Sequence, residues 1–292
     1  MIVRRGWVGP TGFLLLVSFG YAPIAAQQTE YETTKIADGV YQFRFRAHNA
    51  FFAVGETGAF VMDPISAEAA GHLAAAILDA APGVPLQVVA YSHDHADHAT
   101  GAPVLFQKLN RAPVVGHERA KEKIVARGDP ALPPPDITVG DGEAYVAELG
   151  GRTVELRYLG KSHSDNMLVA FVPEQKVVFA VDFVSRNSVG YRDLPDYHYP
   201  DFLEAMRKLQ EIEYETIVFG HGPPGDRSAV DAQLRYYTEL RDAVAAAIRD
   251  GLSADEAMER VRLPRYAEWR GYSDWFPLNV GKMYRWLSEG GG

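Results

Sequence analysis

Short apolar runs alternate with helical patterns along the chain, in two successive halves. In the first half the pattern predicts strands at residues 40–46, 50–54, 59–62, 86–91 and 112–116, and helices at residues 67–80, 102–110 and 118–127. In the second half it predicts strands at residues 144–149, 153–158, 167–172, 177–181 and 216–219, and helices at residues 201–211, 229–249 and 253–261. Each half has its own set of strands, which favours an α/β fold of two packed mixed sheets with helices outside.

Polar side chains gather where the apolar strands end. The predicted strand 86–91 is apolar throughout almost all of its length, which is typical of a strand buried on both faces. It runs directly into the segment 92–98, which is rich in histidine and aspartate. Ligands of α/β proteins usually bind at such strand ends, so we expect the functional site there.

The first 26 residues have the pattern of a secretory signal peptide. Arg4 and Arg5 precede an apolar stretch, and Ala25-Ala26 supplies small residues for cleavage. Removal would leave residues 27–292 as a single domain with a helical, aromatic-rich C-terminal tail from about residue 229, without a stable membrane anchor. We therefore expect a periplasmic or secreted protein.

The amino-acid composition limits the kinds of metal ligand and partner that the protein can have. The 292 residues contain no cysteine and nine histidines, so any metal must be held by imidazole and carboxylate groups. The formal net charge of −9 would fall to about −11 without the two arginines of the signal segment, which argues against nucleic acid as a partner. A small molecule is the expected substrate, and the oligomeric state stays open.

The strongest motif is His93-x-His95-x-Asp97-His98, directly after a buried strand. On an extended segment His93 and His95 project to the same side, whereas Asp97 and His98 follow on a turn and can face a second point nearby. Four ligand-type side chains within six residues predict a metal site.

Three later residues fit the same site. His163 lies in a polar turn between two strands, Asp182 ends the apolar run 177–181, and His221 follows the strand 216–219. Each alone could be structural. Together with the first motif they make five histidines and two aspartates, which is enough for two zinc ions, with iron and manganese as alternatives.

With these residues the chain resembles the metallo-β-lactamase-fold hydrolases over about residues 40–225. The resemblance implies a four-layer αββα sandwich of two mixed sheets. It implies one zinc ion on His93, His95 and His163, a second on Asp97, His98 and His221, and Asp182 bridging both. It also implies a hydroxide between the metals as the nucleophile, with Asp97 as the catalytic carboxylate that orients it.

The residue at position 182 indicates a branch of this family. Relatives with classical β-lactamase activity carry cysteine there, whereas an aspartate bridge is similar to the glyoxalase-II-like and lactonase-like branch. We expect hydrolysis of a carboxylic ester, thioester, lactone or lactam. Two alternatives are β-lactamase activity proper and a mononuclear iron enzyme similar to persulfide dioxygenases.

Substrate specificity must come from loops. The segment 187–199 offers Tyr191, Tyr197 and His198 as candidate substrate-binding residues. The aromatic tail could form a further wall of the pocket, although docking of the tail onto the core is the favoured interpretation. Asp63 is a candidate for fixing a ligand imidazole, and Asp94 should point away from the metals.

Overall fold

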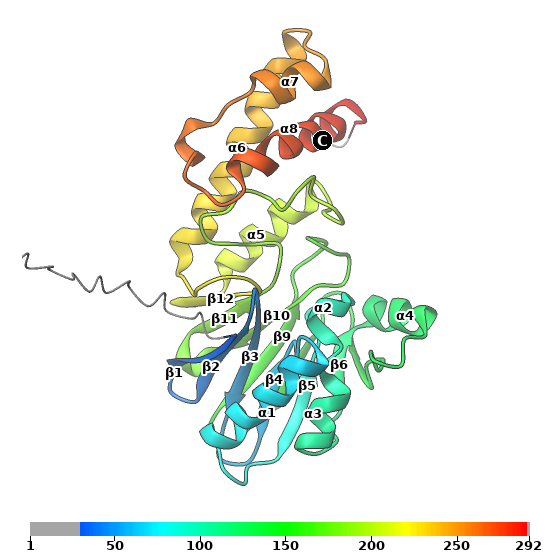
Figure 1. Ribbon diagram of the computed structural model, residues 1–292, viewed down its shortest axis with the longest axis vertical. Coiled ribbons are helices and arrows are strands. Elements are labelled where there is room, and N and C mark those ends of the chain that lie inside the picture. Colours follow the sequence, from blue (N-terminus) through cyan, green and yellow to red (C-terminus); the bar gives the residue numbers. More distant parts are fainter. Residues whose placement is uncertain (1–29, 291–292) are drawn as a thin grey trace, which may run out of the picture.

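The computed structural model describes residues 30–290, so the predicted signal peptide, residues 1–26, lies outside the described residues. Two β-sheets pack face to face with helices on both outer surfaces (Figure 1). This arrangement confirms the predicted four-layer αββα sandwich. None of the helices in residues 30–290 is long and apolar enough to span a membrane.

The first sheet has seven strands in the order of the sequence. They are β1 (Tyr31–Ala37), β2 (Val40–Phe45), β3 (His48–Val54), β4 (Ala59–Met62), β5 (Leu86–Ala90), β6 (Val114–His117) and β7 (Ile137–Val139). Pairing is antiparallel from β1 to β4 and parallel from β4 to β7. The sheet is therefore mixed. The histidine-rich segment follows β5, which is a central strand of its parallel part.

The second sheet has five strands in the order β12-β11-β10-β9-β8. They are β8 (Ala144–Glu148), β9 (Thr153–Tyr158), β10 (Leu168–Val172), β11 (Val177–Ala180) and β12 (Thr216–Phe219). Only β11 and β12 run parallel, so the ends of these two strands reach the same edge of the sheet. Gly150 and Gly151, both with a positive φ, form the hairpin turn between β8 and β9.

Successive side chains of the central strands point to opposite faces of the sheet, and both faces are buried. This explains why these strands are apolar throughout. In β3 the side chains of Phe51 and Ala53 enter the core between the sheets, whereas Phe52 faces the helices on the other side. Phe51 stacks on Phe179 of β11, with ring centroids 5.4 Å apart, so the two sheets meet directly. Burial on both faces removes any need for polar positions in these strands.

Four helices cover the first sheet, namely α1 (Ala67–Ala80), α2 (Ala96–Ala99), α3 (Ala102–Lys108) and α4 (Glu118–Arg127). On the side of the second sheet, α5 (Asp201–Glu211) packs with α6 (Arg227–Arg249), and α7 (Ala254–Arg260) and α8 (Tyr272–Ser288) pack on α6. The last three form a group that projects beyond the sheets, coloured yellow to red in Figure 1. A capping box of Ser253 and Glu256 opens α7.

Besides the four-residue helix α2, where a turn was expected, two strands and one α-helix were not expected. β1 escaped prediction because it is a mostly exposed edge strand whose sequence, YETTKIA, carries little apolar signal. β7 has only three residues, and two of them are exposed. In the tail, α8 is a 17-residue helix with Pro277 inside it, and a proline normally argues against a continuous helix.

Candidate metal centre

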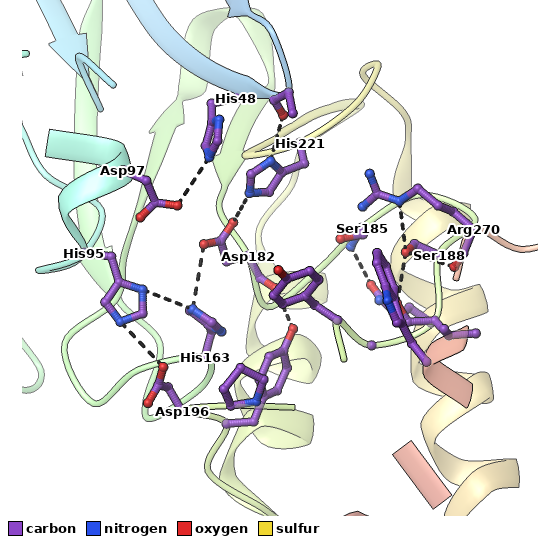
Figure 2. Close-up of a pocket in the computed structure, with 18 residues that line it drawn as sticks. His48, His95, Asp97, His163, Asp182, Ser185, Ser188, Asp196, His221 and Arg270 are labelled. Atoms are coloured by element: carbon purple, nitrogen blue, oxygen red, sulfur yellow. Dashed lines mark hydrogen bonds and ion pairs between the residues drawn. The ribbon is translucent and has the colours of Figure 1, made fainter. Parts of the chain in front are cut away.

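The seven predicted ligands converge at the edge where strands of both sheets end. His93 follows β5 in a bend, His95 has extended backbone, and Asp97 and His98 lie in the short helix α2, in agreement with the expected change of direction. The other three come from the second sheet: His163 precedes β10, Asp182 follows β11 and His221 follows β12. Figure 2 shows Asp97, His95, His163, Asp182 and His221 turned toward one another.

One group of ligand atoms comprises His93, His95, His163 and Asp182, and they all lie within 4.8 Å of one another. Nδ1 of His95 is 3.3 Å from Nε2 of His163. Oδ2 of Asp182 is 3.7 Å from Nε2 of His93 and 3.8 Å from Nε2 of His163. These three histidines are the set expected for the first metal.

A second group lies on the other side of Asp182. Oδ2 of Asp182 is 3.2 Å from Nε2 of His98, and Oδ1 of Asp182 is 3.0 Å from Nε2 of His221. Oδ2 of Asp97 lies 3.9 Å from Nε2 of His98. Asp182 therefore stands between the two groups, where the family resemblance places the bridging carboxylate.

His48 is a further member of the second group, and it is not among the ligands predicted from the sequence. Its ligand atom lies within 4.8 Å of those of His98 and His221, and its Nε2 is 3.3 Å from Oδ2 of Asp97. It begins β3, at the turn after β2. No local ligand spacing marks this position, so only the three-dimensional arrangement identifies it.

The residues fit metal ions on the structure itself. Nε2 of His93, both ring nitrogens of His98, Nδ1 of His163 and Oδ1 of Asp182 are buried without a hydrogen-bond partner among the described residues. Unpaired buried polar atoms are costly, and a bound cation would satisfy those that face the cluster. Ligand atoms at about 2 Å from a tetrahedral zinc ion lie about 3.3 Å from one another, close to the separations seen here.

Neighbouring groups fix the orientation of the imidazoles. Nδ1 of His221 lies 2.7 Å from the carbonyl oxygen of Ala47, so it carries the proton and leaves Nε2 free toward Asp182. Ser92 donates its hydroxyl to Asp63 at 2.6 Å and lies 2.8 Å from Nδ1 of His93. Nε2 of His93 is thereby left free toward the cluster.

Asp63 touches both groups. It is fully buried, it accepts the backbone N–H of Ser92 at 2.7 Å, and its Oδ2 lies 3.3 Å from Nδ1 of His98. This placement supports the prediction that Asp63 orients a ligand. Asp94 points elsewhere as predicted, to Arg127 and Asn166 at 2.7 and 2.8 Å.

The two groups differ in electrostatics. Burial lowers the pKa of His93 and His163 below the ordinary histidine value, so these rings are neutral and ready to bind a cation. Burial acts the same way on His98 and His221, but their contacts with Asp182 outweigh it and raise both pKa values. Burial alone would raise the pKa of Asp182, yet the surrounding imidazoles hold it well below its usual range.

A tight turn delivers Asp182. The N–H of Phe183 donates to the carbonyl oxygen of Val181 at 2.6 Å, and Asp182 between them has φ 56°. Aspartate tolerates this left-handed region better than most side chains. Gly220 packs against the turn, and a Cβ there would lie 2.9 Å from Oδ1 of Asp182, so only glycine leaves room for the carboxylate.

A pocket with a cavity volume of about 390 Å³ opens over the cluster. Tyr191 and Tyr197 line it as predicted, and the Tyr197 hydroxyl donates to the carbonyl oxygen of Asp182 at 2.6 Å. His198, the third candidate, lines a neighbouring hollow with Lys123 and Lys282. From the aromatic tail, Trp275 lines the pocket, whereas Tyr266 and Phe276 are buried in the core, so the tail takes both expected roles.

Comparisons with known proteins agree with this geometry. A curated relative, the 2,4-dinitroanisole O-demethylase subunit alpha of Nocardioides sp. (strain JS1661), is 27% identical over 220 residues. The aligned region covers 75% of this chain and 62% of the relative, so the chain spans less than two thirds of the relative's length.

Solved structures share the fold at low identity. A metallo-beta-lactamase from Pontibacter korlensis has a TM-score of 0.59 at 22% identity, over 70% of this chain and 97% of that one. A stereoselective inverting sec-alkylsulfatase from Pseudomonas sp. has a TM-score of 0.71 at 16% identity, over 87% of this chain and 50% of that one. The family model of the metallo-beta-lactamase superfamily matches residues 43–221, well over half of the sequence. The chain therefore belongs to the metallo-beta-lactamase superfamily.

Proposed function

We propose that this protein is an exported hydrolase that holds two zinc ions and cleaves a carboxylic ester, thioester, lactone or lactam. Members of the superfamily are metal-dependent hydrolases or related enzymes. The observation that carries the proposal is the pair of ligand groups on either side of Asp182, with buried ring nitrogens that make no hydrogen bond of good geometry among the described residues. Export rests on the signal pattern of residues 1–26.

The residues divide the work between them. When bound, two zinc ions would supply hydroxide at neutral pH and polarise the bond to be broken. His93, His95 and His163 would hold the first ion, His98 and His221 the second with Asp97, and Asp182 would hold both. The backbone turn at Asp182 and the Tyr197 hydroxyl keep the shared carboxylate in place.

Asp97 is the carboxylate best placed to orient the nucleophile and to accept its proton. A hydrogen bond from His48, offset partly by burial, lowers the pKa of Asp97 to about 2. The carboxyl group is therefore ionised at neutral pH, and its side chain is 56% exposed toward the pocket. His48 would hold it in position from the other side.

A second candidate reaction is cleavage of an aryl ether. The name of the Nocardioides relative indicates O-demethylation of a substituted anisole. The observation that favours this reaction here is the aromatic lining of the pocket by Tyr191, Tyr197 and Trp275. Aromatic side chains bind flat rings by stacking and edge-to-face contact.

Metal analysis combined with a hydrolysis panel tests the proposal. Purified protein should contain two zinc ions per chain, and one iron ion per chain would support the dioxygenase-like alternative. The panel should include an aryl ester, a thioester, a homoserine lactone, a chromogenic lactam, a sulfate ester and an anisole. We expect turnover of at least one carboxylic substrate, and His93→Ala should lose both metal and turnover. Unchanged metal content and turnover in His93→Ala would refute the proposal.

A further inference from the structure

Arg270 lies in the pocket, on the wall away from most of the ligand cluster. Figure 2 shows Arg270, Ser185 and Ser188 on one side and His48, His95 and Asp97 on the other. Among the described residues that line the pocket, Arg270 is the sole arginine or lysine. Its guanidinium group forms no ion pair with a carboxylate of residues 30–290, and its one polar side-chain contact is a long one, 3.5 Å, to the Ser188 hydroxyl.

The backbone holds this arginine firmly. The N–H of Arg270 donates to the carbonyl oxygen of Asn187 at 2.9 Å, and the N–H of Val189 donates to the carbonyl oxygen of Arg270 at 3.1 Å. Ser188 and Arg270 form a parallel bridge between the loop after Asp182 and the C-terminal tail. Two backbone hydrogen bonds thus fix the position from which the Arg270 side chain starts.

Aromatic rings flank the guanidinium. Its central carbon lies 5.8 Å from the centroid of the Trp275 ring, and Trp275 meets Tyr191 edge to face at 5.1 Å. An exposed arginine beside an aromatic ring can bind a planar oxyanion through two parallel hydrogen bonds, while the ring covers the apolar part of the ligand. The three carboxylates of the pocket, Asp97, Asp182 and Asp196, lie among or beside the histidines.

We infer that Arg270 selects substrates that carry a carboxylate on a flat, apolar skeleton, with the scissile bond at the opposite end over the ligand cluster. This inference rests on the proposed function and adds the class of substrate to it. Arg270 and Trp275 both lie outside residues 43–221, the region that matches the superfamily. The selectivity is therefore a property of the C-terminal tail of this chain.

Two matched pairs of compounds test the inference. In the first pair, 4-acetoxybenzoate and 4-acetoxybenzamide differ only in charge, and their KM values report selectivity during turnover. In the second pair, 1-naphthoate and 1-naphthamide need no hydrolysis, and their Kd values report selectivity by calorimetry on the metal-loaded protein. If no ester is cleaved, the second pair still tests Arg270, so failure of the proposed function is distinguishable from failure of this inference.

The variants are Arg270→Met and the control Arg192→Met. Arg192 belongs to the loop after Asp182 and lies over the ring of Tyr191, with 5.0 Å from its central carbon to the ring centroid, but it does not line the pocket. The wild type should bind the carboxylate at least about tenfold more tightly than the amide. Arg270→Met should reduce that ratio to about one, Arg270→Lys should restore part of it, and Arg192→Met should keep it. A wild type without preference, or a ratio that persists in Arg270→Met, would overturn the inference.

Discussion

Asp63 shows how one carboxylate can serve both ligand groups. It is fully buried, it holds Ser92 by two hydrogen bonds, and through Ser92 it orients His93. The same carboxylate lies 3.3 Å from Nδ1 of His98. Its negative charge makes both imidazoles better ligands, and groups of this kind affect metal affinity almost as strongly as the ligands themselves.

Asp63→Asn should therefore weaken metal binding by about 10- to 100-fold, because the amide keeps the shape but removes the charge. Competition with a chelator measures the change. Asp94→Asn is the matched control, since Asp94 is also buried and adjoins the ligands in sequence but pairs with Arg127. Equal metal affinity in Asp63→Asn and the wild type would contradict the assigned role.

Proton release should accompany binding at the second group of ligands. The contacts with Asp182 raise the pKa values of His98 and His221, so these rings keep a proton to higher pH than an ordinary histidine, and a cation must displace it. Their protonated fraction falls as pH rises, so metal affinity should increase between about pH 6 and pH 8. Calorimetry in buffers of different ionisation enthalpy counts the released protons. An affinity that does not change with pH would be evidence against this assignment.

At the scale of elements, the turn after β12 depends on β3. The buried amide of Asn49 donates to the carbonyl oxygens of Phe219 and Gly222 at 2.8 and 2.7 Å, and its backbone N–H donates to Gly220. These bonds hold the turn that carries His221. A single side chain of the first sheet thus positions a ligand that follows the second sheet.

Asn49→Ala should lower the free energy of unfolding by about 3 kcal/mol, from three lost side-chain hydrogen bonds, and should also weaken metal binding. Asn110→Ala is a matched control, because Asn110 bridges the N–H and carbonyl of Leu86 through its own amide, away from the ligands. The control should lose stability in chemical denaturation but keep metal affinity. Equal loss of metal affinity in both variants would show that the loss follows from lower stability and not from the turn that carries His221.

Most of the fold and of the candidate site was predictable from local patterns. Apolar runs located the central strands, and their polar ends located His93, Asp182 and His221. The exposed strand β1 and the partner residue His48 were missed for a shared physical reason. Neither has a local signal, because β1 buries little apolar surface and His48 gains its neighbours from segments 49 to 173 residues away.

At the scale of the whole molecule, the ligand cluster joins the two sheets. His93, His95, Asp97 and His98 follow a strand of the first sheet, whereas His163, Asp182 and His221 adjoin strands of the second. A bound cation would therefore stabilise the contact between the sheets as well as the site. Binding to the folded state alone raises stability in proportion to the logarithm of ligand concentration over Kd.

Removal of metal by a chelator should lower the melting temperature, and restored zinc should recover it. At a free zinc concentration of 100 times Kd, the stabilisation per site is about 2.7 kcal/mol. Differential scanning calorimetry measures the change. His93→Ala should respond less to the chelator than the wild type, and an equal response would place the stabilising cation elsewhere.

The position of Asp182 between the two halves has a consequence for biogenesis. A chain in which only the first half has folded presents the four ligands that follow β5, but it lacks the shared carboxylate and the histidines on either side of it. Tight retention of metal then becomes available only after both sheets have docked. Metal content in a preparation would thus report the completeness of folding. Incompletely folded or misassembled chains would be recognised by their lack of bound metal.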